Sequence, residues 1–259
     1  MKNAISLNNK KQSLKSTRPR PAPNGMSVLI GTPIHVSKDY SMERWLENVS
    51  KLEYPADLLL VDNSPGLDYA EEVKGYCKKY GISPVKNLVP VRNKIPNGTI
   101  SNGVKKYKIK HLNIPQGEKT DKSIDEQIHE RIIRSREIIR KEFLSSDYDA
   151  YFLWESDEII PSDALNKLVK LMRAGNFMVV VHNCWINDNP NHVNFDYGIV
   201  LFSRECLGKY SWLPQFGTDP EMPNNWYEAE LWFRKRIHED GCSYTEVTGL
   251  IEPVYHLAK

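Results

Sequence analysis

Short apolar segments alternate with amphipathic ones along most of the chain. Apolar runs at 27–30, 58–61 and 151–154 have the length of buried strands, and polar or turn-forming residues follow each of them. Over 41–54 and 69–80, apolar residues recur at intervals of three or four, which predicts helices with one buried face. Strands that alternate with helices predict a mostly parallel sheet covered on both faces, and therefore an α/β fold.

The same alternation continues in the second half of the chain. A long helix is expected to begin after Ser123, and its buried stripe is predicted to consist of Ile124, Ile128, Ile132, Ile139 and Phe143. Further helices are expected at 165–172 and 225–240, and further strands at 84–89, 177–182, 197–203 and 244–247. No internal repeat is visible in the sequence.

Two segments interrupt the pattern. Residues 1–25 are rich in Lys, Arg, Asn, Ser and Pro and have almost no large apolar side chains, which predicts a flexible basic tail. Residues 90–122 are polar and contain Asn97-Gly98 and Asn102-Gly103, two turn signals that predict an inserted hairpin or loop. We therefore expect a single domain at 26–259 behind the tail.

Composition and charge narrow the functions that fit this fold. The 259 residues carry a net charge of +2, which argues against a specific nucleic-acid binder with a broad basic face. No apolar run approaches the roughly 20 residues that span a bilayer, and no secretory signal is recognisable. The four cysteines include no Cys-x-x-Cys pair. A cytoplasmic protein is expected, with peripheral membrane contact through the tail as the alternative.

An acidic pair follows the strand predicted at 151–154. In an extended chain residues i and i+2 face the same side, so Glu155 and Asp157 should project together while Ser156 points away. Two carboxylates, completed by diphosphate oxygens and water, suit Mn²⁺ or Mg²⁺. The alternative is a strand that ends in an ordinary acidic turn.

Polar residues also follow the first two predicted strands. Ligands of parallel sheets bind at the carboxyl ends of the strands, where Thr32, Pro33, Asp62 and Asn63 are expected to lie. Asp62 can accept hydrogen bonds from a ribose hydroxyl or a base N–H. Its alternative role is to cap the turn that follows, while Thr32 and Pro33 either support a base or merely end the strand.

The remaining candidates lie on helices or near the last residues. Arg136, and Arg140 one turn later, offer guanidinium groups that match the oxygens of a diphosphate. Glu228 and Glu230 are candidate general bases, although acidic residues also favour the first turn of a helix. His256 is a candidate Mn²⁺ ligand, and a solvated or core histidine is the alternative.

The order of these motifs resembles that of GT-A glycosyltransferases, particularly family 2-like members, over Ser27–His256. The matching segments are Ser27–Pro33, Leu60–Ser64, Ser135–Leu144, Asp147–Asp157, Gly198–Arg204 and Glu228–Gly241. The resemblance implies a GT-A fold, in which a Rossmann-like nucleotide-binding half is fused to an acceptor half around a mostly parallel central sheet.

The same resemblance implies an activity and roles for the candidate residues. It implies metal-dependent, inverting transfer of a sugar from a UDP- or GDP-sugar donor to an acceptor hydroxyl of a glycan, lipid or protein. Glu155, Asp157 and His256 would hold the metal, Arg136 would steady the leaving diphosphate, and Glu230 would be the base. Glu155 and Glu230 each replace the usual aspartate of the family's motifs.

Two other functions are compatible with this fold. A sugar-phosphate nucleotidyltransferase normally has a Gly-rich loop with Arg and Lys after its first strand, whereas this chain has His35-Val36-Ser37-Lys38 there. A non-catalytic nucleotide-sugar or glycan-binding module stays open, because the glutamates replace aspartates at the metal and base positions.

Overall fold

The computed structural model describes residues 25–90, 103–117, 121–182, 197–216 and 225–258. The expected basic tail therefore lies outside the described residues apart from Gly25, as does most of the first half of the segment 90–122. Within the described ranges, no helix is long and apolar enough to cross a membrane.

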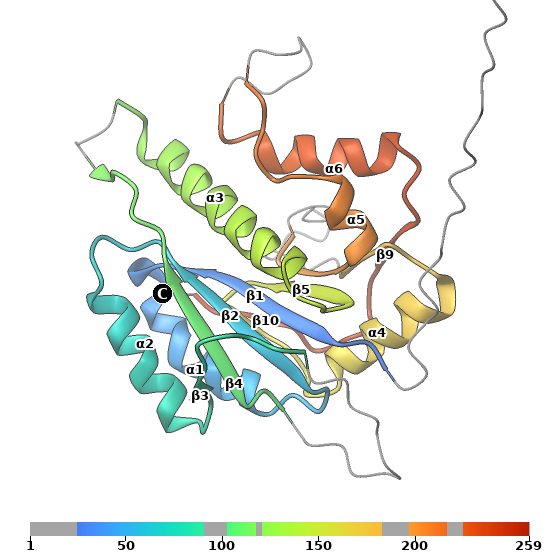
Figure 1. Ribbon diagram of the computed structural model, residues 1–259, viewed down its shortest axis with the longest axis horizontal. Helices are drawn as coiled ribbons and strands as arrows, with labels where there is room; N and C mark the ends of the chain where they lie inside the picture. Colours follow the sequence, from blue (N-terminus) through green and yellow to red (C-terminus); the bar gives the residue numbers. More distant parts are fainter. Residues whose placement is uncertain (1–24, 91–102, 118–120, 183–196, 217–224, 259) are drawn as a thin grey trace, which may run out of the picture.

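An eight-stranded sheet forms the centre of the molecule, in the order β3-β4-β2-β1-β5-β8-β7-β9 (Figure 1). Its strands are β1 (Val28–Ile34), β2 (Ala56–Asp62), β3 (Ser83–Pro84), β4 (Lys106–His111), β5 (Ala150–Trp154), β7 (Val179–His182), β8 (Ile199–Ser203) and β9 (Tyr244–Val247). Only β8 runs antiparallel to its neighbours in this sheet. The mostly parallel sheet expected from the sequence is confirmed.

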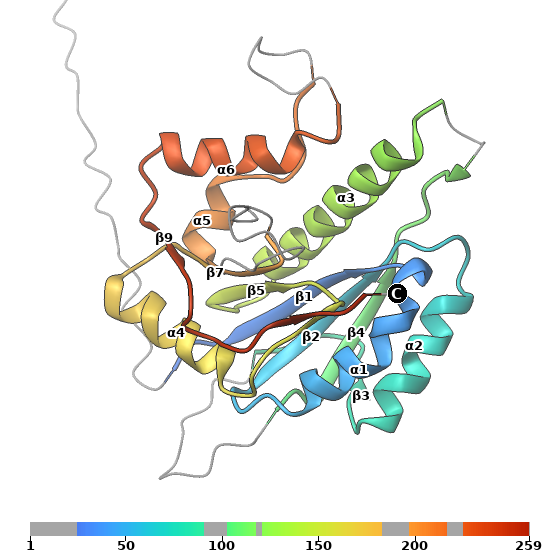
Figure 2. The same ribbon diagram turned by 180° about the vertical axis from the view of Figure 1, so that it is seen from behind.

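Helices cover both faces of the sheet, as two opposite views show (Figures 1 and 2). Helices α1 (Asp39–Ser50), α2 (Asp68–Lys79) and α4 (Ala164–Gly175) pack on one face, and α3 (Ile124–Leu144), α5 (Arg204–Lys209) and α6 (Ala229–Glu239) on the other. A 3-10 helix, Val36–Lys38, joins β1 to α1. The short strands β6 (Glu158–Ile159) and β10 (Tyr255–His256) form a separate antiparallel pair.

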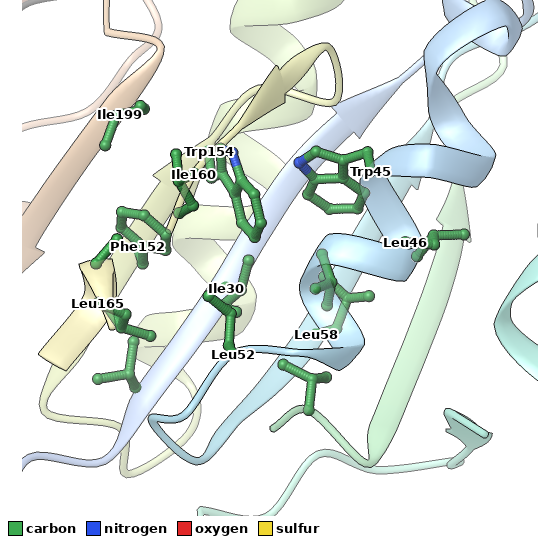
Figure 3. Close-up of a cluster of buried hydrophobic side chains, with 14 of the residues drawn as sticks. Ile30, Trp45, Leu46, Leu52, Leu58, Phe152, Trp154, Ile160, Leu165 and Ile199 are labelled. Carbon is green, nitrogen blue, oxygen red and sulfur yellow. The ribbon is translucent and has the colours of Figure 1, made fainter. Parts of the chain in front are cut away.

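The core on the α1 side fixes the end of strand β5. Trp45 of α1 and Trp154, the last residue of β5, are both fully buried, with ring centroids 4.9 Å apart (Figure 3). Aromatic rings at this separation attract each other beyond the gain from burial alone. This contact positions the chain directly before Glu155, so the core sets the starting point of the acidic turn.

The strand predicted at 84–89 is mostly absent from the described sheet, and a strand that was not predicted, β4, pairs with β2. Of the predicted strand 84–89 only Pro84 lies in a strand, β3, which it forms with Ser83. β4 lies inside the segment expected to be a hairpin or loop. β4 pairs in parallel with β2 and places His111 opposite Asp62. Its Tyr107 is buried among the core residues of this face. The segment is therefore partly a structural strand, because pairing with β2 satisfies its backbone and buries its apolar side chains.

The long helix α3 begins where expected, and its predicted buried stripe is confirmed at Ile139 and Phe143 but not at Ile124, Ile128 and Ile132. The Ser123 hydroxyl caps it by accepting from the Glu126 amide at 3.2 Å. Ile124 is 74% exposed, and Ile133 is buried instead, together with Ile139 and Phe143. The first turns of α3 extend beyond the strands (Figure 1), which agrees with the exposure of Ile124 and Ile128.

Candidate functional site

Five chain segments converge at the carboxyl ends of β1, β2, β4 and β5. They are the 3-10 helix after β1, the turn after β2, the end of β4, the turn between β5 and β6, and strand β10, which pairs with β6. Helices α3 and α6 add side chains from the face they cover. Parallel α/β sheets bind their ligands at this edge, and most of the predicted site residues lie here.

A lysine lies between the two acidic side chains that follow β5. Lys38, the last residue of the 3-10 helix, places its ammonium 3.3 Å from Glu155 Oε2 and 2.9 Å from Asp157 Oδ1. The acidic residues belong to a turn, in which the Glu158 amide lies 3.3 Å from the Glu155 carbonyl. The two carboxylates therefore meet at one point, although a turn rather than an extended strand brings them together.

The charges of this group stabilise one another. Burial by itself would raise the pKa of Glu155, but Lys38 and Arg136 outweigh it and hold that pKa below its usual value. Burial by itself would lower the pKa of Lys38, but the carboxylates of Glu155 and Asp157 raise it well above its usual value. At neutral pH Glu155 is therefore a carboxylate in direct contact with the Lys38 ammonium.

Asp157 also contacts a histidine and a tyrosine. The antiparallel pairing of β10 with β6 sets His256 opposite Glu158, and the Leu257 amide donates to the Asp157 carbonyl at 2.7 Å. His256 Nε2 consequently lies 3.5 Å from Asp157 Oδ2. The Tyr40 hydroxyl donates to the same oxygen at 3.2 Å. Tyr40 and Lys38 were not among the sequence candidates, since neither belongs to a recognisable motif.

An arginine connects the acidic turn to helix α6. Arg136, buried on α3, has one guanidinium nitrogen 3.4 Å from Glu155 Oε1 and pairs with Glu230 through another. Glu230 lies in the first turn of α6 and also accepts from the Tyr197 amide at 2.8 Å. Two of the predicted residues, 94 positions apart, are thus joined by an ion pair.

The end of β2 carries a buried aspartate with two partners. Asp62 has no exposed surface; its Oδ1 accepts from the Ser64 amide at 3.0 Å, and its Oδ2 lies 3.0 Å from His111 Nδ1. Asn63 donates from its side chain to the Ser135 hydroxyl at 3.0 Å. The structure thus shows the capping role considered for Asp62, while its ligand-binding role stays a prediction.

Two further polar side chains, Gln116 and His35, lie beside Asn63 and near this aspartate, and neither was predicted from the sequence. Gln116 donates from Nε2 to the Asn63 carbonyl at 2.7 Å, and its Oε1 lies 3.3 Å from His35 Nε2. Burial lowers the pKa of His35, an effect that Gln116 and Asp62 only partly offset. His111 is the last residue of β4, in which apolar and polar residues alternate. That alternation is the sequence signal by which His111 could have been predicted to lie at a strand end.

Thr32 and Pro33 lie within β1 and not in a loop after it. β1 continues to Ile34, which pairs with Asp62. β5 pairs with β1 only as far as Gly31, so the segment that contains Pro33 is free of ladder bonds on that side and tolerates proline. The Thr32 hydroxyl is buried and donates to the Trp154 carbonyl at 2.8 Å, which ties β1 to the end of β5.

Two candidates take no part in this group of contacts. Arg140 donates from Nε to the carbonyls of Leu207 at 2.8 Å and Tyr210 at 2.6 Å, and it pairs with Glu137 at 2.9 Å. Its guanidinium therefore anchors α5 and the segment after it. Glu228 is exposed at the start of α6, and its side chain makes no capping hydrogen bond there.

The side chains at this edge supply some, but not all, of the ligands that a divalent cation needs. Asp157 and His256 offer a carboxylate and an imidazole whose atoms are 3.5 Å apart, a pair that can share one Mn²⁺. Among the described residues no group of three or more His, Cys, Asp or Glu side chains is arranged as a metal site. The remaining ligands would have to come from diphosphate oxygens and water, as is usual for Mg²⁺ sites. Lys38 occupies the space between Glu155 and Asp157.

No protein-family model and no curated protein sequence matches the chain significantly. Solved structures do. The S. aureus TarS structure aligns with a TM-score of 0.55 and 11% identity, covering 90% of this chain and 37% of TarS. The mannosyltransferase PcManGT from Pyrobaculum calidifontis, in complex with GDP-Man and Mn²⁺, aligns with a TM-score of 0.53 and 12% identity, covering 89% and 59%.

Glucosyl-3-phosphoglycerate synthase from Mycobacterium tuberculosis aligns with a TM-score of 0.51 and 11% identity, covering 91% of this chain and 73% of that enzyme. The chain thus spans well under two thirds of TarS and of the mannosyltransferase. At these identities the likeness concerns the fold. The protein has the GT-A fold, the architecture of nucleotide-sugar-dependent glycosyltransferases.

Proposed function

We propose that this protein is a metal-dependent glycosyltransferase that transfers a sugar from a UDP- or GDP-sugar to an acceptor hydroxyl. The observation that carries the proposal is the approach of Asp157 and His256 at the edge of the sheet, on the same edge as Asp62. Metal-ligating side chains and a hydrogen-bond acceptor for a nucleoside would then lie along one edge of the sheet, which supports the proposal. Structures with this fold include TarS with UDP-GlcNAc and PcManGT with GDP-Man and Mn²⁺.

In this proposal the nucleoside lies against the ends of β1, β2 and β4. Asp62 would accept from a ribose hydroxyl or a base N–H, and His111 holds its second oxygen in place at 3.0 Å. Gln116 and His35 complete a polar surface around that aspartate. The nearby Asn63 contacts Ser135 through its side chain and Gln116 through its carbonyl, so it would help to hold this polar surface in place.

The diphosphate would lie between the acidic turn and Arg136. Asp157 and His256 would hold Mn²⁺ or Mg²⁺, with Glu155 reached directly or through water. A bound cation would neutralise the charge that develops on the leaving diphosphate. Arg136 is fixed by Glu155 and Glu230, so its guanidinium is positioned before any ligand binds.

Glu230 is the proposed general base for the acceptor, which would be a glycan, lipid or protein hydroxyl. It is fixed by Arg136 and by the Tyr197 amide, whereas Glu228 is exposed and has no such positioning. An inverting displacement would require the Glu230 carboxylate to act on the acceptor at the side of the sugar opposite the leaving diphosphate. The product of the reaction would therefore have the opposite anomeric configuration to the donor.

The test is a panel of UDP- and GDP-sugars, each with and without Mn²⁺, read by thermal shift and by release of the nucleoside diphosphate. One donor should raise the Tm only when Mn²⁺ is present, because a ligand stabilises the state to which it binds. Asp157→Asn should abolish that shift and the metal-dependent donor hydrolysis. Asp163→Asn, at the start of α4 and remote from this edge, is the matched control.

If no nucleotide sugar changes the Tm with or without metal, the proposal is wrong. If a donor and Mn²⁺ bind but no hydrolysis or transfer occurs, the non-catalytic binding module becomes the better explanation.

A further inference from the structure

Lys38 is placed where a metal ion would have to enter. Its ammonium contacts Asp157 Oδ1 at 2.9 Å and Glu155 Oε2 at 3.3 Å, so it bridges the two carboxylates that follow β5. The other oxygen of Asp157 faces Tyr40 and His256. A cation that binds Asp157 therefore meets a positive charge already within 3 Å of one of its carboxylate oxygens.

The neighbouring charges strengthen this competition. Glu155 is shared by Lys38 and Arg136, and Arg136 is held in turn by Glu230. The three acidic side chains Glu155, Asp157 and Glu230 thus face two cations, Lys38 and Arg136. A divalent ion gains less from a carboxylate that an ammonium already neutralises, and it is repelled by that ammonium at short range.

We propose that Lys38 is a resident counter-cation that keeps the metal site closed until a donor diphosphate binds. This inference rests on the proposed function and deepens it. The diphosphate would draw the Lys38 ammonium away from Glu155 and Asp157 and leave both carboxylates to the metal. Metal and donor would then bind with positive coupling that passes through this one side chain.

The character of lysine supports such an exchange of partners. Its ammonium is a compact charge on a flexible stem that binds phosphate oxygens as readily as carboxylates. The Lys38 side chain is 35% exposed, whereas Asp157 is 3% exposed, so the lysine has room to move and the aspartate does not. Because coupling between two ligands is reciprocal, the donor must strengthen metal binding by the same factor as the metal strengthens donor binding.

The experiment titrates Mn²⁺ calorimetrically into the wild-type protein and Lys38→Met, each with and without saturating UDP. Wild type should bind Mn²⁺ weakly alone and more tightly with UDP. Lys38→Met should bind Mn²⁺ alone on the order of tenfold more tightly than wild type, and UDP should add less to it. Lys38→Arg keeps the charge and should behave like wild type. Lys51→Met, at an exposed lysine paired with Glu47, is the control.

Thermal unfolding without nucleotide provides a second readout. Lys38→Met leaves Glu155 and Asp157 without this cation, so the Tm of the variant should be lower than that of wild type. Mn²⁺ alone should raise the Tm of the variant by more than it raises the Tm of wild type. Equal Mn²⁺ affinity in wild type and Lys38→Met, with UDP strengthening both alike, would overturn the role of Lys38 and leave the proposed function standing. If no protein binds UDP, the same titrations are made with GDP. Failure of every protein to bind Mn²⁺ with either nucleotide would overturn both proposals.

Discussion

Replacing Arg136 with methionine should destabilise the protein by about 3 kcal/mol. The guanidinium is 2% exposed and pairs with both Glu155 and Glu230, so the substitution would leave two carboxylates without their shared partner. Removing one partner of a buried ion pair costs roughly 3–5 kcal/mol. The lower end applies because the glutamate side chains remain 24% and 20% exposed, and water therefore screens part of their repulsion.

Thermal and urea unfolding at pH 7 would measure this loss. For a chain of this size a loss of about 3 kcal/mol lowers the Tm by roughly 6–12 °C. Arg134→Met is the matched control, since Arg134 lies on the same helix and pairs with Glu130 but is 41% exposed. Its loss should stay below about 1 kcal/mol. A Tm for Arg136→Met within about 2 °C of wild type would refute the reasoning.

Lowering the pH should reduce the difference in unfolding free energy between wild type and Arg136→Met. The pKa of Glu155 lies below its ordinary value of 4.5 in the folded protein, so its ion pairs add stability above that pH and lose it as the pH falls through the folded value. Without Arg136 the pKa of Glu155 is lowered less, so Glu155 becomes protonated at a higher pH in the variant than in wild type. The double variant with Glu230→Gln should regain part of the loss, whereas equal losses in single and double variants would contradict an ion-pair origin.

Three further predictions concern single positions. His256→Ala should weaken Mn²⁺ binding by about tenfold or more in calorimetry while leaving the metal-free Tm unchanged, and an unchanged affinity would exclude it as a ligand. Because burial lowers the pKa of His35, the unfolded state takes up protons first, and wild-type urea midpoints should fall as the pH drops below 6.5. His35→Asn should reduce this dependence, and the part that remains is expected from His182, whose pKa burial also lowers. In Gly31→Ala the added Cβ would lie 2.4 Å from Ile139 and 2.5 Å from Tyr151, so unfolding experiments should show a loss of about 1–3 kcal/mol.

The ends of the central strands were predictable because local pattern and burial agree there. The apolar run before Asp62 and the run before Glu155 are strands buried on both faces, and such strands read as continuous apolar segments. Each must stop where its polar residue begins. The helix that carries Arg136 was equally visible, since Ser123 caps it in the expected way.

Strand β4 was not found, although its sequence contains the signal. Tyr107 and Ile109 alternate with lysines, and Lys108 and Lys110 pair with Glu142 of α3 on the opposite side. Period-2 alternation of this kind indicates a strand. The Asn-Gly turn signals nearby led instead to the expectation of a hairpin or loop for the whole segment, and the partner strand β2 is 40 or more residues away in the sequence.

The sequence alone determined the α/β alternation, the polar strand ends and the amphipathic helices, because these depend on residues that are neighbours along the chain. The tertiary structure decided which side chains meet. Lys38 reaches Asp157 across 119 positions, and Arg136 reaches Glu230 across 94. It also placed Arg140 against the carbonyls of Leu207 and Tyr210 instead of at the sheet edge. Contacts of this kind depend on how separate elements pack against one another. The periodicity of a sequence reports only which face of each element is buried, so it does not specify which elements meet.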